Sequence, residues 1–169
     1  MSQRHLAAAC LPFVIVLAAS CTAAAEQDSS ERDSAGAVES AGDVGVFALQ
    51  VGDCFDDPSL AAAADATVSV EEVAAVPCET PHDFQAFAEF NVEEAETYPG
   101  DEVIFDQAEA GCVERFEPFV GLSYEESRYE FSYLYPTTDT WEAGDREILC
   151  SLADPNGEKL TADLRGSAE

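Results

Sequence analysis

The sequence is poor in positive charge. It holds 7 lysines and arginines against 35 aspartates and glutamates, and its formal net charge is −28. Proteins that bind nucleic acid need clustered lysines and arginines to replace the counterions of the phosphates. An anionic lipid surface repels such a chain for the same reason. The composition therefore excludes nucleic acid as a partner, and any attachment to a membrane has to depend on a lipid anchor rather than on charge.

Long apolar runs are also missing, except at the N-terminus. Residues 6–19 are almost unbroken apolar sequence behind the weakly basic pair Arg4 and His5. The run is too short to span a bilayer comfortably, since a transmembrane helix needs about 20 residues, and its position is typical of an export signal. We predict a signal peptide over residues 1–20 and an exported protein.

The end of this run contains a candidate lipidation site. Residues 17–21 read Leu-Ala-Ala-Ser-Cys, which resembles the lipobox of bacterial lipoproteins, although Ala18 stands where leucine is commoner. In that reading Cys21 is lipidated and anchors the protein to the outer face of the cytoplasmic membrane. The alternative is an ordinary secretory signal cut near residues 23–25, which would discard Cys21 and release the protein.

Aromatic residues are absent from residues 21–43, which consist mainly of Ala, Ser, Glu, Asp and Gly. Such a segment cannot bury enough apolar surface to offset the entropy of ordering it. We predict a disordered acidic tether over residues 21–43 and a folded domain over residues 44–169.

One segment of the domain has the period of a helix. Asp101 is the expected N-cap and Gly121 the expected C-terminal stop. Between them, apolar side chains recur at helical spacing and form one stripe, made of Phe105, Ala108, Cys112, Phe116 and Phe119. Such a stripe is typical of a core-facing helix rather than of a cofactor site.

The other periodic segments indicate strands. Alternating or β-branched apolar residues predict strands over residues 46–51, 67–76, 84–92, 129–135, 146–152 and 160–164. Residues 137–144 are expected to form a loop, and residues 154–157 a hairpin turn. One helix with short-connected strands predicts an α+β fold, with an antiparallel sheet of about five or six strands and the main helix packed on one face.

Four cysteines remain in the domain, and an even number in an exported chain predicts two disulfides with three possible pairings. Cys112 lies on the helix stripe, and Cys150 shares a strand face with Ile148 and Leu152. If that face meets the helix, the pairs are Cys112–Cys150 and Cys54–Cys78.

Few residues are candidates for chemistry. His82 follows Pro81 and is the only histidine left after removal of the signal, but a G-x-S-x-G motif and a Ser-x-x-Lys site are both lacking. The spacing of Cys78 and His82 would suit zinc, yet there is no C-x-x-C pair and export favours disulfides. We therefore expect no metal, no cofactor and no catalytic residue. His82, Trp141 and Arg146 remain binding candidates, although a turn-capping histidine, a packed tryptophan and a structural ion pair are the expected roles.

An ordered set of motifs resembles the septum-formation domain of actinobacterial envelope proteins over about residues 47–166. Its members are Val51-Gly52-Asp53-Cys54-Phe55, Val76-Pro77-Cys78, Pro81-His82, Tyr98-Pro99-Gly100, Cys112, Phe116, Gly121, Trp141, Gly144, Arg146 and Cys150. The resemblance implies an exported or membrane-tethered, non-enzymatic domain that is associated with division septa. A lipid-anchored form without membrane helices departs from relatives that carry transmembrane segments.

Three functions are compatible with these observations. The first is a non-enzymatic envelope lipoprotein that contacts an envelope or septal protein, or a wall polymer, at the cell surface. The second is a cell-wall hydrolase that uses carboxylates and His82. The third is a lipoprotein that binds a small ligand or a cation.

Lipidation of Cys21 is directly testable. We expect labelled palmitate to be incorporated into the wild-type protein and not into the Cys21→Ala variant. Globomycin, which blocks lipoprotein signal cleavage, should leave a longer precursor. Unlabelled protein that is free in the culture medium would instead support the ordinary secretory signal.

Overall fold

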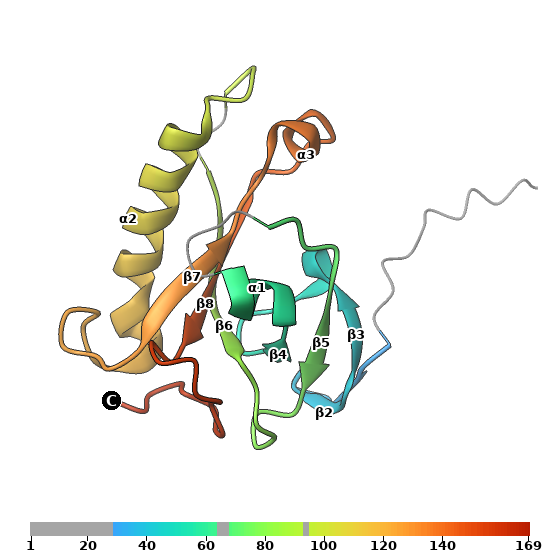
Figure 1. Cartoon of the computed structure of the whole chain (residues 1–169), viewed down its shortest axis with the longest axis vertical. Coiled ribbons are helices and arrows are strands. Elements are labelled where there is room, and N and C mark those ends of the chain that lie inside the picture. Colours follow the sequence, from blue (N-terminus) through green and yellow to red (C-terminus); the bar gives the residue numbers. More distant parts are fainter. Residues whose placement is uncertain (1–28, 64–67, 93–94) are drawn as a thin grey trace, which may run out of the picture.

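The computed structural model describes residues 29–63, 68–92 and 95–169 (Figure 1). The predicted signal peptide over residues 1–20, the lipidation site Cys21 and the first part of the predicted tether lie outside the described residues. The prediction of an α+β fold with an antiparallel sheet and one main helix is confirmed.

The sheet has six strands in the order β3-β5-β4-β6-β8-β7, and neighbouring strands are antiparallel. Two further strands, β1 and β2, form a small separate ribbon. The strands are β1 Glu31–Arg32, β2 Val38–Ser40, β3 Gly42–Gly45, β4 Cys54–Asp56, β5 Glu72–Val76, β6 Phe84–Asn91, β7 Glu130–Leu134 and β8 Glu147–Ala153. The helices are the 3-10 turn η1 Val46–Ala48, α1 Pro58–Ala63, α2 Asp101–Val120 and α3 Thr138–Glu142.

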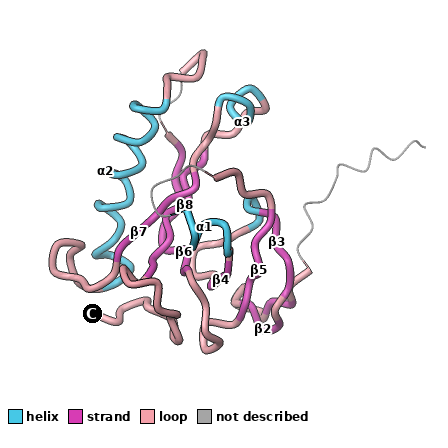
Figure 2. Tube along the Cα trace, in the orientation of Figure 1, coloured by secondary structure: helices cyan, strands magenta, loops and turns pink. Residues whose placement is uncertain are grey.

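The sheet separates two apolar cores. Figure 2 shows α2 lying along one side of the β6-β8-β7 half of the sheet. The first core fills the space between them, where Ile104 and Phe116 of α2 pack with Ile148 of β8. The second core lies on the opposite face, around Phe55 of β4 and Leu149 of β8.

Strand β6 turns two consecutive side chains to the first core because its pairing is irregular. The register with β8 shifts between Ala86 and Ala88, which is the mark of a β-bulge. Ala86 belongs to the second core, whereas Phe87 and Ala88 both belong to the first. The Phe87 ring meets the ring of Phe116 edge to face, with 5.6 Å between centroids. The bulge accounts for the one break in the alternation of the predicted strand.

Helix α2 matches its prediction except at its first residue. The N-cap is Gly100, at φ 98°, rather than the predicted Asp101. Asp101 is the first helical residue, and its carboxylate accepts a hydrogen bond from the Tyr98 hydroxyl at 2.6 Å. An acidic side chain in the first turn still interacts favourably with the helix dipole. Gly121 ends the helix in the left-handed conformation, as predicted.

Both predicted disulfides are present. Cys112–Cys150 joins α2 to β8, with 5.8 Å between Cα atoms, and Cys54–Cys78 joins β4 to the residues after β5. The chain between the partners spans 24 residues for Cys54–Cys78 and 38 for Cys112–Cys150. Closing loops of this length stabilises the folded state by about 3.5 and about 4 kcal/mol, because each disulfide lowers the entropy of the unfolded chain.

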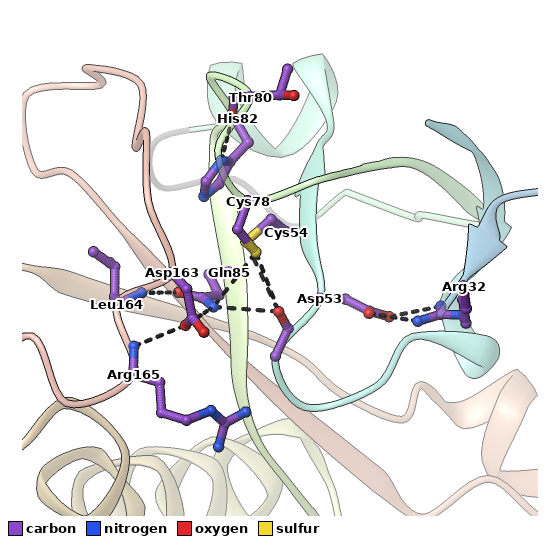
Figure 3. Close-up of a disulfide and its surroundings, with 11 residues drawn as sticks. Arg32, Asp53, Cys54, Cys78, Thr80, His82, Gln85, Asp163, Leu164 and Arg165 are labelled. Atoms are coloured by element: carbon purple, nitrogen blue, oxygen red, sulfur yellow. Dashed lines mark hydrogen bonds and ion pairs between the residues drawn. A yellow bond between two sulfur atoms is a disulfide. The ribbon is translucent and has the colours of Figure 1, made fainter. Parts of the chain in front are cut away.

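The prediction that the tether stays disordered to residue 43 is wrong for its described part. Strand β3 pairs with β5, and Val38 and Val44 are buried in the second core. Arg32 forms a two-pronged ion pair with Asp53, at 2.6 and 2.9 Å (Figure 3). The physical reason is that Val38 and Arg32 of the predicted tether find partners far along the chain, which local composition does not reveal.

Three further expectations need correction. Residues 46–51 are not a strand, because the strand precedes them as β3 and η1 follows it. The expected loop at residues 137–144 contains α3, whose start is stabilised by a capping box between Thr137 and Thr140. Residues 160–164 form no hairpin with β8, because Leu160 pairs instead with His82 in an isolated bridge.

A single glycine sets the distance between α2 and β6. A Cβ on Gly111 would lie 2.2 Å from Cζ of the Phe90 ring. We expect Gly111→Ala to lower the free energy of unfolding by about 1–3 kcal/mol through overpacking, although alanine favours a helix interior by about 1 kcal/mol. Urea unfolding measures the change. Adding Phe90→Leu should restore part of the loss, and a single variant as stable as wild type would contradict the close approach.

Candidate functional site

The first candidate region is the corner held by Cys54–Cys78. The backbone turns sharply after Cys78, where the amide of Thr80 donates to the carbonyl of Pro77 at 2.8 Å. The chain then enters β6 beside Leu160, to which His82 is joined by two backbone hydrogen bonds of 2.8 and 3.0 Å. Figure 3 shows the disulfide and His82 at the same end of β6.

His82 is fully buried in this corner. Its Nδ1 lies 2.7 Å from the carbonyl oxygen of Thr80, and a carbonyl can only accept, so Nδ1 carries the proton. Its Nε2 is buried without a hydrogen-bond partner among the described residues. Burial is the main cause that lowers the pKa of His82, partly opposed by its bond to Thr80 and by the charge of Asp56. The ring is therefore neutral and shielded from solvent, which suits a turn-stabilising role.

Lys159, the only lysine of the chain, binds two carboxylates next to this corner. The Lys159 ammonium lies 2.8 Å from Oδ1 of Asp56 and 2.8 Å from Oδ1 of Asp83. These two hydrogen bonds raise the pKa of Lys159. The ammonium links the C-terminal segment to β4 and to the start of β6.

A buried glutamine fastens the C-terminal segment to the sheet. The Gln85 amide donates to Asp163 at 2.7 Å and its oxygen accepts from the backbone amide of Leu164 at 2.8 Å (Figure 3). Gln85 is fully buried, so removing its amide would leave those partners unsatisfied. Sequence reasoning missed this residue, because it stood at an expected polar position of an alternating strand.

Trp141 and Arg146 lie together, away from the corner. Arg146 places its guanidinium 3.5 Å from the centroid of the Trp141 ring and donates to the backbone carbonyls of Trp141 and Asp145. The Tyr98 ring also packs against Trp141, edge to face, with 5.7 Å between ring centroids. Trp141 is buried. The Arg146 guanidinium therefore forms a cation–π contact with Trp141 and hydrogen bonds to backbone carbonyls, where an ion pair was expected.

A second candidate region is a cavity of about 410 Å³, which we call the seam cavity. It lies on the face of the sheet that carries the second core, where Phe84 of β6 and Leu149 of β8 line it, and it reaches β7 at the edge of the sheet. One wall is formed by residues 132–135, at the end of β7. The opposite wall is formed by η1 and by residues 68–70. Its volume falls in the range of about 300–1,000 Å³ typical of binding pockets.

The walls of the seam cavity combine aromatic and acidic side chains. Phe105 of α2 and Tyr135 meet edge to face, with 4.9 Å between ring centroids, and Phe47 lines the opposite side with 52% of its surface exposed. Asp145 and Glu147 supply carboxylates, and the described lining residues include no lysine, arginine or histidine. The cavity is therefore suited to a ligand with apolar groups and positive charge.

The sequence-predicted candidates do not converge on this cavity. Trp141 and Arg146 share one contact, His82 lies in the other region, and none of the three is among the described residues that line the cavity. The cavity residues Phe47 and Tyr133 were missed as binding residues, because each was read as part of a strand. The only local signal was the run of aromatic residues at alternate positions of β7.

The described residues were also searched for metal-binding groups and for helices that could cross a membrane. Among residues 29–63, 68–92 and 95–169, no group of three or more His, Cys, Asp and Glu side chains is arranged to hold a metal ion. In the same part of the chain, no helix combines the length and the apolar character needed to cross a membrane.

Comparison with known proteins gives a family match. A family model described as septum formation matches residues 52–169. This range begins at the glycine before Asp53 and contains both disulfides, α2 and the β6-β8-β7 half of the sheet. Neither the curated proteins nor the solved structures gave a match.

The buried His82 should make stability depend on pH. The unfolded chain binds a proton on this histidine below about pH 6.5, whereas burial lowers the pKa in the folded state. Stability from this group is therefore complete above the unfolded pKa and is lost as the pH falls from there through the lowered folded pKa. We expect the free energy of unfolding to fall between about pH 7 and about pH 5.5.

The His82→Gln variant provides the comparison, because an amide cannot titrate. Its stability should change less over the same interval, whatever its absolute value, as measured by urea unfolding at each pH. Parallel pH profiles for the two proteins would show that His82 is not held neutral by the fold.

Proposed function

The chain belongs to the septum-formation family, and we propose that its domain is a non-enzymatic binding module of the cell envelope that takes part in septation. The family match is the observation that carries this proposal. It confirms the resemblance predicted from the motifs over residues 47–166, and it covers residues 52–169. The family name supplies the link to septa, and the structure supplies the reasons for a binding module.

The groups best suited to catalysis have structural roles. All four cysteines of the domain are consumed in disulfides, so none is available as a thiolate nucleophile. His82 is buried with one nitrogen bound to a carbonyl, and a general base must instead reach the proton that it removes. These observations support binding over hydrolysis.

The proposed lipid anchor would hold the domain close to the membrane. If Cys21 is lipidated, seven residues separate it from Ser29, the first described residue. Even a fully extended chain spans at most about 3.6 Å per residue, so the anchor would lie within roughly 30 Å of the fold. The predicted 23-residue tether would have allowed a longer reach. A membrane-proximal partner, such as a septal envelope protein, therefore fits better than a distant layer of the wall.

The proposal predicts where the protein is found in dividing cells. An epitope inserted after Gly157, which lies in an exposed turn, should be labelled on the cell surface and be enriched at division sites. Cells that lack the protein should show misplaced or delayed septa. The matched control is the same epitope in the Cys21→Ala variant, which should lose the surface label if lipidation holds the protein.

Other outcomes would overturn the proposal. Uniform surface labelling with normal septa in the deletion strain would remove the link to septation. Clearing of peptidoglycan in a zymogram by the wild-type protein, and not by the His82→Ala variant, would establish the hydrolase instead.

A further inference from the structure

Strand β7 is an edge strand with an open side. It is the last strand in the sheet order, and β8 is its one pairing partner within residues 29–63, 68–92 and 95–169. At the other end of the sheet, β3 is partly covered, because Asp43 exchanges hydrogen bonds with Ser29 through its backbone carbonyl and amide, at 2.9 and 2.8 Å. The two edges of the sheet are therefore not equivalent.

The edge of β7 lacks the usual protection. Natural edge strands are commonly guarded by lysines, prolines, bulges or inward charges. The five residues Glu130–Leu134 contain one charge, at the first position, and no proline. Their pairing with β8 continues without a register shift over all five positions. An unguarded edge of this kind is able to pair with another strand.

The seam cavity lies alongside this edge. Four consecutive residues, 132–135, all contribute to its lining. Successive side chains of a strand point to opposite faces, so the cavity meets both faces of the sheet at β7, and Phe84 of β6 and Leu149 of β8 extend it over the face of the second core. Leu134 and Leu149 belong to the second core, whereas Phe105 and Tyr133 pack on the first. Side chains of an added strand would thus find apolar contacts on both faces.

The acidic residues of the seam cavity favour a positively charged ligand. Asp145 and Glu147 stand at one end of the seam cavity, with no basic residue among its described lining, and the chain as a whole carries −28. Burial and the charge of Glu109 raise the pKa of Tyr133, so its ring stays neutral. Neutral aromatic faces beside carboxylates favour lysine or arginine side chains.

We propose that the open edge of β7 and the seam cavity bind an extended, basic segment of a partner protein, which adds to the sheet as a seventh strand. Backbone hydrogen bonds to β7 would supply affinity, and the cavity would accept apolar side chains from alternate positions. Asp145 and Glu147 would select for positive charge. This inference rests on the proposed function and names the site through which the domain binds.

Two other occupants are disfavoured by charge. A second copy of the chain would bring another surface of net charge −28 against the first, and such like-charge contacts are unfavourable. Residues 22–28 of the chain itself contain Glu26 and Asp28 and no basic residue. A basic segment from another protein is the occupant that the electrostatics favours.

The test uses the exported chain and a synthetic probe. The probe is a short peptide in which valine alternates with lysine around a central phenylalanine, with blocked ends. Two control peptides are needed: one with glutamate in place of lysine, and one with alternate backbone amides N-methylated along a single edge. The N-methylated peptide keeps the charge and loses the donors, so it separates strand addition from unspecific attraction to an acidic protein.

We expect saturable binding of the lysine peptide by calorimetry, weakened at least about ten-fold by N-methylation because several backbone hydrogen bonds are lost. The glutamate peptide should not bind. Amide hydrogen exchange followed by NMR should show new protection in Glu130–Leu134 and not in β3. Phe47→Ser should weaken binding about three- to ten-fold, since the exposed ring covers one wall. Val103→Ser, at an apolar residue of α2 that is 42% exposed and lies outside the cavity, should have no effect.

Three results would overturn the inference. Equal affinity for the lysine peptide and its N-methylated form would show unspecific charge attraction. Protection outside β7 would identify another site. Dimers in analytical ultracentrifugation that are lost on Phe47→Ser would assign the edge to a second copy. Each of these leaves septal localisation untouched, whereas peptide binding at β7 in a protein that is absent from septa would preserve the site and remove the proposed function.

Discussion

The arrangement of the domain depends on how strand β6 divides its side chains between two cores. Phe84 and Ala86 face the second core, and after the bulge Phe87 and Ala88 face the first. Without the extra residue, Ala88 would alternate back to the side of Ala86 and leave the first core. One end of β6 pairs with β4 at the disulfide corner. Further along the strand, the Phe90 ring lies against Gly111 of α2.

The two disulfides hold together a strongly acidic domain. A surface of net charge −28 repels itself, which favours expanded states. Cys112–Cys150 fixes the helix to the sheet across the first core, and Cys54–Cys78 holds the corner from which β6 begins. Their entropic effect on the unfolded chain opposes the expansion. The negative charge opposes association between copies of the protein and also destabilises the compact state. The two disulfides offset that destabilisation.

The same sheet explains why the proposed binding surface lies away from the residues that suggested chemistry. His82 and the disulfide cysteines are used to build one end of β6, and Trp141 and Arg146 support each other at the start of β8. What remains available is the open edge of β7 and the seam cavity, which lies between β7 and the segments that flank β3 and β5. Closure would have removed the edge. Its absence leaves a strand with unused backbone groups beside an apolar hollow.

The amino-acid sequence by itself determined the fold class, the position of α2 and the strands at β6, β7 and β8, because these follow from short-range periodicity. It indicated the disulfide pairs only on the condition that the strand face of Cys150 meets the helix, which the tertiary structure decided. It also carried the family, through the order of its motifs. Only the tertiary structure decided that residues 29–43 join the fold, that Leu160 bridges His82 rather than starting a hairpin strand, and that Phe47 and Tyr133 line one cavity. These depend on contacts between segments dozens of residues apart. Such contacts leave no periodic trace in the local sequence, since each requires only one or two residues with a partner elsewhere.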